Sequence, residues 1–168
     1  EKPRYIWIDA AANFPDFANS KENIARDLKL AKEAGFTDIV VDIRPSSGDI
    51  LYKSSVPGVD EVKWLGAWVN GKFSRVDRTA TWDYLQAFIE ESRKLELKVH
   101  AGFNTMVGGE SDGLGPQGIL YRDPTKKSWA TSENLATGIT NTLDNGGGTK
   151  FFNPANEEVH TYLCDLLK

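Results

Sequence analysis

The sequence predicts an α/β fold of the (β/α)8 TIM-barrel type, represented by about three βα units with long loops after the strands. Three apolar runs have the length and composition of buried strands, at residues 5–10, 38–43 and 97–103. An amphipathic helical pattern follows each run, and the connections from helix back to strand are short. The connections after the strands are long, at Ala11–Asn19, Arg44–Ala80 and Asn104–Asn153. This asymmetry is typical of α/β proteins, whose ligand sites gather at the carboxyl ends of parallel strands.

The chain is shorter than a complete barrel. A (β/α)8 barrel needs roughly 250 residues, and this sequence has 168. We therefore expect residues 1–168 to form the amino-terminal part of such a barrel, with exposed edge strands and apolar helix faces. Exposed edges of this kind favour self-association.

Local signals support the individual elements. Ile24, Leu28 and Ala31 give a helix over about residues 20–34 one apolar face, and Asn19 or Ser20 is its predicted cap. Thr81 is the predicted cap of the second helix, and Asn153 that of the last. Asn70-Gly71, between Trp64–Val69 and Phe73–Val76, predicts a hairpin with a primed turn.

Several functions are disfavoured by what the sequence lacks. The fingerprint of dinucleotide-binding sheets is missing after the first strand, and there is no P-loop, so the open-sheet alternative loses its commonest functions. The net charge is −4 and no basic stripe is present, which argues against nucleic acid as a partner. No apolar run is long enough to span a membrane. His100 and His160 lie far apart and Cys164 is single, so no metal and no cofactor are expected.

Aromatic residues in the predicted loops offer two interpretations. Their rings could stack against the apolar faces of sugars, or they could form small cores that close the loops. For any one ring, burial is the favoured alternative. The residues are Phe14, Phe17, Tyr52, Trp64, Trp68, Phe73 and Tyr121.

Polar side chains at the carboxyl ends of the predicted strands are the candidate substrate-binding residues, because these ends converge in a barrel. They are Asp9 after the first strand, Asp42, Arg44, Asp49 and Tyr52 on and after the second, and His100 and Asn104 on the third. Arg44 could bind a substrate hydroxyl or carboxylate, or form a structural ion pair with Asp42. His100 could bind a substrate hydroxyl or be a hydrogen-bonded core residue.

Four segments resemble one known family. Residues 44–55, Arg-Pro-Ser-Ser-Gly-Asp-Ile-Leu-Tyr-Lys-Ser-Ser, are similar to the "RPxGDALY-SS" signature of the glycosyl-hydrolase-like family 10 proteins, which bacteria often secrete. Residues 5–8 resemble its first strand, residues 97–104 its "HAWFN" strand, and residues 152–159 its "NP-xx-EV" helix start. The segments follow the family's order and span nearly the whole chain.

The resemblance implies a glycoside hydrolase acting on a poly- or oligosaccharide, secreted or held in the periplasm or at the cell surface. It also implies that the catalytic carboxylates lie on strands beyond Lys168, so that this chain supplies part of the substrate-binding face through Arg44, Asp49, Tyr52, His100 and Asn104. Asp42 and Gly102 depart from the family pattern and put its pocket shape in doubt. The alternative from another class is a non-catalytic carbohydrate-binding or structural module.

Overall fold

The computed structural model describes residues 2–168 and divides them into two compact units. Unit 1 comprises the chain up to Ile43, with Leu51–Lys53 and Val62–Phe103. Unit 2 comprises Arg44–Ile50, Ser54–Glu61 and Asn104–Lys168. Each unit is described by itself.

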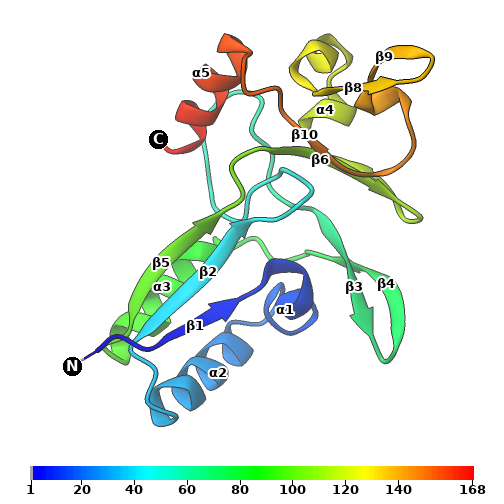
Figure 1. The fold of residues 1–168 in the computed structure, drawn as a ribbon. Helices are drawn as coiled ribbons and strands as arrows, with labels where there is room; N and C mark the ends of the chain where they lie inside the picture. The colour runs from blue at the N-terminus through cyan, green and yellow to red at the C-terminus, as the bar shows by residue number, and fades with distance from the viewer. Residues whose placement is uncertain (1) are drawn as a thin grey trace. The chain divides into compact units, whose positions relative to one another are not determined.

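A three-stranded sheet lies at the centre of unit 1. Its strands are β1 (Tyr5–Ile8), β2 (Asp38–Arg44) and β5 (Lys98–Phe103), in the order β1-β2-β5. β1 and β2 are parallel, in a register that pairs Tyr5 with Asp38. The arrows of all three strands run in the same direction (Figure 1). The three strands predicted from the apolar runs are therefore present and adjacent.

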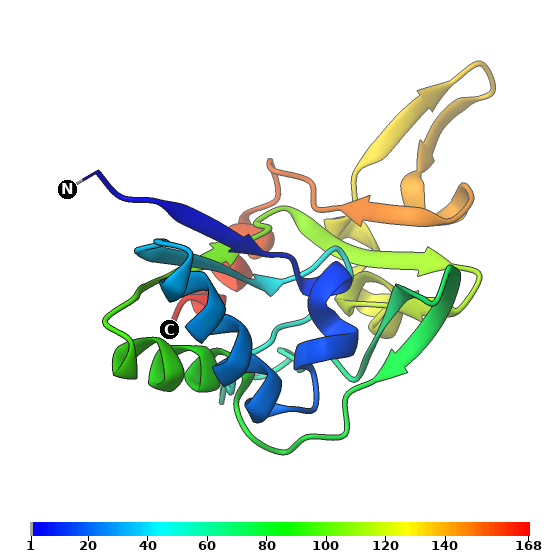
Figure 2. The same ribbon diagram turned by 90° about the horizontal axis from the view of Figure 1, so that it is seen from below.

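Helices cover one face of this sheet. They are α2 (Lys21–Glu33) and α3 (Tyr84–Lys94), which contact each other (Figure 2). A further helix, α1 (Ala10–Phe17), follows β1 and packs against α2. The core between helices and sheet contains fully buried Ile24, Ile39 and Phe88. The predicted loop Ala11–Asn19 is thus wrong, because α1 occupies most of it and buries Phe14 and Phe17.

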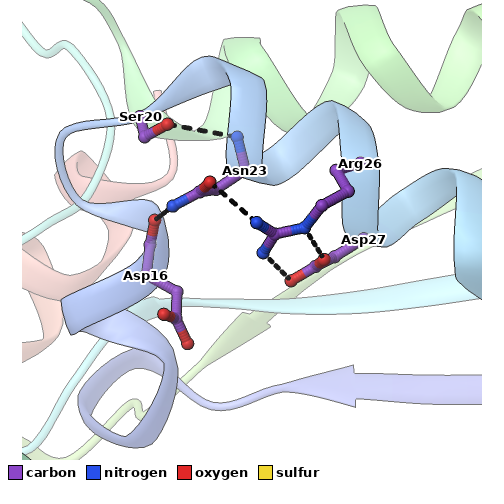
Figure 3. A network of polar contacts seen from close by, with 5 residues as sticks. All are labelled: Asp16, Ser20, Asn23, Arg26 and Asp27. Atoms are coloured by element: carbon purple, nitrogen blue, oxygen red, sulfur yellow. Dashed lines mark hydrogen bonds and ion pairs between the residues drawn. The ribbon is translucent and has the colours of Figure 1, made fainter.

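A small polar network joins α1 to α2 (Figure 3). The Ser20 hydroxyl accepts a hydrogen bond from the Asn23 backbone N–H at 3.1 Å and caps α2. The Asn23 side chain donates to the Asp16 carbonyl at 2.8 Å, and Arg26 forms an ion pair with Asp27 at 2.7 Å. Of the two caps predicted for this helix, Ser20 is the one used.

The other two predicted helix caps are displaced by a few residues. Asp83, not Thr81, caps α3 by accepting from the Gln86 N–H at 2.9 Å. Asn156, not Asn153, caps α5 (Glu157–Leu166) by accepting from the Glu158 N–H at 2.9 Å. The residues that cap the helices lie two positions downstream of the predicted cap in α3 and three positions downstream in α5.

The predicted hairpin is confirmed in unit 1. β3 (Trp64–Val69) pairs antiparallel with β4 (Lys72–Asp77). Asn70 and Gly71 both have positive φ, 51° and 76°, as a primed two-residue turn requires. Leu65 and Ala67 point to the buried face of the hairpin, so the alternate residues of β3 face outward.

Unit 2 consists of short antiparallel sheets and short helices. β6 (Val107–Asp112) pairs with β7 (Gly115–Gln117) on one side and β10 (Gly148–Phe151) on the other. A second hairpin joins β8 (Ser132–Leu135) to β9 (Gly138–Asn141). The remaining elements are α4 (Ile119–Arg122), α5, and 3-10 turns at Pro124–Trp129 and Thr142–Asp144.

A ring cluster and a tight glycine contact organise unit 2. Trp129, Phe152 and Tyr162 form a triangle with ring centroids 5.3–6.1 Å apart. Gly118 has φ +91°, and a Cβ at this position would lie 2.1 Å from the Ser47 carbonyl oxygen. Only glycine fits there, because a side chain would collide with backbone that cannot move aside.

The predicted barrel is wrong. Seven of the ten strands within residues 2–168 belong to antiparallel sheets, and no sheet among these residues closes on itself. The cause lies in the segments predicted as loops. Residues 44–80 and 104–153 contain the strands β3, β4 and β6–β10, which pair with one another and so satisfy their own backbone groups. Three adjacent strands of one direction remain, and they form an open sheet.

Candidate functional site

The structure divides the predicted site residues between the two units. Unit 1 contains Asp9, Asp42, Tyr52 and His100, and unit 2 contains Arg44, Asp49 and Asn104. The groups of each unit form their own constellations, described in turn below.

Two predicted carboxylates flank a buried tyrosine in unit 1. Asp9 caps α1 by accepting from the Ala12 N–H at 2.7 Å, and Asp42 is buried on β2. Burial raises the pKa of the Tyr84 phenol well above its ordinary value; Arg78 opposes this rise, and the charges of Asp42 and Asp9 add to it. The Tyr84 hydroxyl has no hydrogen-bond partner among the residues described. Sequence reasoning missed this residue, because Tyr84 falls within a helix whose pattern is apolar.

His100 forms a close pair with an aspartate that was not predicted. Its Nε2 lies 2.7 Å from Oδ1 of Asp38, whose Oδ2 accepts from the Thr37 hydroxyl at 2.5 Å. The Thr37 hydrogen bond, followed by that of His100, lowers the pKa of the Asp38 carboxyl. The Tyr5 ring lies against the imidazole with centroids 5.4 Å apart. These four side chains belong to the wall of a cavity of about 400 Å³ in unit 1.

The position of this cavity differs from the predicted one. Asp38 is the first residue of β2, and the cavity also contacts Lys2 and Pro3, which precede β1. His100 therefore lies in a cavity near the amino ends of the strands, whereas the prediction placed it toward their carboxyl ends. Tyr52 is partly buried against the hydrophobic core.

Arg44 and Asn104 contact each other in unit 2. The completely buried Arg44 guanidinium donates to the carbonyls of Asn104 at 2.5 Å and Val107 at 2.6 Å. The Asn104 amide donates back to the Arg44 carbonyl at 2.9 Å. A guanidinium bonded to several carbonyls of the segment 104–107 holds that backbone in place. A direct role of either residue in substrate binding stays a prediction.

Asp49 lies in a cluster with one cation between two acids. Its carboxylate is 3.1 Å from Nη1 of Arg122, while Nε of the same guanidinium is 3.0 Å from Asp60. The Asp49 side chain is only 9% exposed. Burial raises the pKa of Asp49 to about 6, although Arg122 acts in the opposite direction, and the nearby Asp60 charge raises it further. Arg122 and Asp60 carry no sequence signal that would link them to Asp49.

The outer face of the β3–β4 hairpin carries exposed aromatic rings. Trp68 pairs across the strands with Phe73, with ring centroids 5.9 Å apart, and the two residues are 73% and 38% exposed. The guanidinium carbon of Arg75 lies 4.8 Å from the centroid of the Trp64 ring. Gly66, between the two tryptophans on β3, pairs with Arg75. We refer to the outward residues Trp64, Gly66, Trp68, Phe73, Arg75 and Asp77 as the hairpin face.

The two interpretations of the loop aromatics divide between positions. Phe14 and Phe17 are buried in the core of unit 1, as the packing alternative expects. Trp68 and Phe73 remain open to solvent on the hairpin face. The rings available to stack on a ligand are therefore those of the hairpin, at positions where local sequence had already predicted two strands.

The described residues contain neither a cluster of metal ligands nor a helix that could span a membrane. Over residues 2–168, no group of three or more histidine, cysteine or acidic side chains has the arrangement to hold a metal ion. None of the helices described is both long and apolar enough to cross a membrane.

Comparison with known proteins gives one sequence relative and one structural neighbour. No family model matches the chain. An S-layer-related protein of Niallia circulans is 29% identical over 169 aligned residues, which cover 97% of this chain. The chain spans about 10% of the length of that relative. A crystal structure of a hypothetical protein from Ruminiclostridium thermocellum ATCC 27405 aligns with a TM-score of 0.48 and 18% identity, covering 97% of this chain and 67% of the other.

Proposed function

We propose that this chain recognises carbohydrate at a cell surface, and that the hairpin face is its binding surface. The observation that carries this proposal is the pair of exposed rings, Trp68 and Phe73, on a hairpin whose opposite side is buried. A pyranose ring presents an apolar face of C–H groups and an edge of hydroxyls. Rings fixed on a rigid strand pair can stack on that face, while the neighbouring Arg75 and Asp77 can bind the hydroxyls.

The dimensions of the hairpin face favour a glycan over a folded protein. A standard protein interface buries about 800 Å² on each partner, with some 20–30 residues a side. The hairpin face consists of six outward residues. One of them, Gly66, has no side chain and separates Trp64 from Trp68 on β3. A narrow surface of this kind suits a polymer strand.

The proposed location is supported by the name of the Niallia circulans relative, which describes that protein as S-layer-related. A chain that corresponds to a tenth of such a protein would act as one part of a larger secreted or surface-attached assembly. Carbohydrate polymers are abundant in that setting. The resemblance of this chain's sequence to the glycosyl-hydrolase-like family 10 proteins points to the same class of ligand, carbohydrate.

The test is polysaccharide binding by the purified chain, measured by co-sedimentation with insoluble glycans and by calorimetry with soluble ones. Replacing Trp68 by Ala should weaken binding by about 2 kcal/mol or more, the loss typical of a central tryptophan contact. Trp7→Ala is the matched control, because Trp7 is 64% exposed but lies on β1. Equal loss in both variants, or no loss in W68A, would place the site elsewhere.

Glycoside hydrolysis by the longer protein is the second candidate. The observation that favours it is the Asp49 carboxyl, whose pKa burial raises to about 6, beside Asp60 on the same guanidinium. A carboxylic acid with a raised pKa is suited to donate a proton in glycoside cleavage. Reducing-sugar release by this chain and by a version extended at its carboxyl end separates the alternatives. Activity in the extended protein alone would mean that a carboxylate beyond Lys168 has to act together with Asp49, and silence from both would leave binding as the function.

A further inference from the structure

We infer that the polymer bound by the hairpin face is an acidic polysaccharide, whose carboxylate groups are bound by Arg75. This inference rests on the carbohydrate binding proposed above and adds the chemical class of the polymer. It is carried by the charge of the hairpin and by the way in which the guanidinium is held.

Basic residues outnumber acidic ones along the hairpin segment, whereas the whole chain has a net charge of −4. Between Lys63 and Asp77 the sequence has three basic residues, Lys63, Lys72 and Arg75, and one acidic residue, Asp77. On the hairpin face itself the charges of Arg75 and Asp77 balance, so the excess positive charge comes from Lys63 and Lys72, at opposite ends of the hairpin. Such an excess attracts anions to this part of the chain during encounter.

The Arg75 guanidinium is held in a fixed direction. Its Nε donates to Oδ1 of Asp77 at 2.7 Å, and its guanidinium carbon lies 4.8 Å from the Trp64 ring centroid. A guanidinium has five N–H donors, so this bond to Asp77 uses one, and the side chain is 51% exposed. Planar, oriented guanidinium groups bind carboxylates through two parallel hydrogen bonds. The negative charge of Asp77 offsets the positive charge of Arg75 on this face. Asp77 also holds the guanidinium in one orientation, with its remaining N–H groups available to a carboxylate.

The spacing on β3 fits a polymer with acidic groups at intervals. Trp64 and Trp68 are four residues apart on the same side of the strand, or about 13 Å. Arg75 pairs with Gly66, the residue midway between them. Sugars stacked on Trp68 and Phe73 would therefore bring the next part of the chain past the guanidinium.

The experiment compares two forms of one polymer, polygalacturonate and the same backbone with its carboxylates methyl-esterified. Calorimetry on the whole 168-residue chain should show tighter binding of the acidic form. Arg75→Gln should reduce that preference by about two- to fivefold, the size of one exposed ion pair. Raising the ionic strength from about 0.01 M to about 1 M shortens the screening length from about 30 Å to about 3 Å. The preference for the acidic polymer should then disappear.

Arg26→Gln is the matched control. Arg26 also forms an ion pair with a neighbouring aspartate at 2.7 Å and is 57% exposed, but it lies on α2 (Figure 3). The inference predicts an unchanged preference in R26Q. If both polymer forms bind equally well and W68A weakens the binding of both, the polymer need not be acidic and this inference is wrong. The proposed carbohydrate binding by the hairpin face would still stand. If no glycan, acidic or neutral, binds in a W68A-sensitive way, both proposals fail.

Discussion

Asp38 in unit 1 and Asp49 in unit 2 are both buried and both have a hydrogen-bond partner, yet their pKa values move in opposite directions. The Asp38 side chain is 3% exposed and the pKa of its carboxyl is lowered. The Asp49 side chain is 9% exposed and its pKa is raised to about 6. Burial alone therefore does not decide the protonation of a carboxyl group in this protein.

The difference lies in the bonds that each carboxylate receives. Asp38 has short contacts to two separate groups, at 2.5 Å from Thr37 and 2.7 Å from His100, and hydrogen bonds to the anion outweigh its desolvation. Asp49 receives longer bonds, 3.1 and 3.4 Å, from a single guanidinium that also binds Asp60. A shared and more distant cation does not offset the desolvation of Asp49. Of the two acids, only Asp49 can exchange a proton near neutral pH.

The largest expected effect is on the pH dependence of stability. The folded-state pKa of Asp49, about 6, lies above its ordinary value of 3.8, so the folded state binds the proton more tightly than the unfolded state. Stability should therefore fall as the pH rises from about 4 to about 6 and then level off. Replacing Asp49 by Asn removes this titration. The difference in unfolding free energy between D49N and the wild type should shift by about 3 kcal/mol in favour of Asn between pH 4 and pH 7.

Urea unfolding of both proteins at closely spaced pH values measures this shift. The variant Asp144→Asn, also in unit 2, is the control. Asp144 is exposed and forms an ion pair with the exposed Lys127. A pH-independent offset between D49N and the wild type would mean that Asp49 titrates at its ordinary pKa.

Removing the shared cation should have the next largest effect. Arg122→Gln leaves the Asp49 carboxylate buried without a positive partner at pH 7. Because Arg122 is about a third exposed, we expect a loss of about 1.5–3 kcal/mol, as for a hydrogen bond to a charged group. The loss should shrink toward pH 4, where Asp49 is protonated. Thermal unfolding at the two pH values, with Arg93→Gln on α3 as the control, decides the point.

A smaller effect is expected at Asp38. Thr37→Val keeps the shape of the side chain but removes the hydroxyl that contributes most to the lowered pKa. The pKa of Asp38 should then rise, and the stability that this carboxylate contributes above its ordinary pKa should be lost at a higher pH as the solution is acidified. NMR titration of the carboxyl carbon measures the pKa directly. An unchanged pKa in T37V, with a rise in His100→Phe, would make His100 the main stabiliser.

Local sequence signals were sufficient to predict the three strands of the unit 1 sheet and the β3–β4 hairpin. The apolar runs located β1, β2 and β5, and Asn70-Gly71 located the turn between β3 and β4. The helix α1 was missed because Pro15 interrupts its pattern, although Phe14 and Phe17 bury enough apolar surface to hold it. The barrel was wrongly inferred because its closure depends on pairing between distant segments, which periodicity does not encode.

The candidate sites show the same limit. The hairpin face could be anticipated, since alternation along β3 sets which rings point outward once the turn is known. The partners of His100 and Asp49 could not. Asp38 lies 62 positions from His100, and Arg122 lies 73 positions from Asp49. Residue type and strand position made these two side chains candidate substrate-binding residues, but only the tertiary structure supplies the partner of each.

The smallest expected effect tests the claim that sharing weakens the hold of Arg122 on Asp49. Asp60→Asn removes the second negative charge, whose contribution to the raised pKa of Asp49 ranks below those of burial and Arg122. The pKa of Asp49 should fall toward its ordinary value, so the stability lost between pH 4 and pH 6 should be smaller in D60N than in the wild type. NMR titration of Asp49 with D144N as the control resolves such a change. A rise in the Asp49 pKa would show that Asp60 holds Arg122 in place for Asp49, and would contradict the claim that sharing weakens the hold of Arg122.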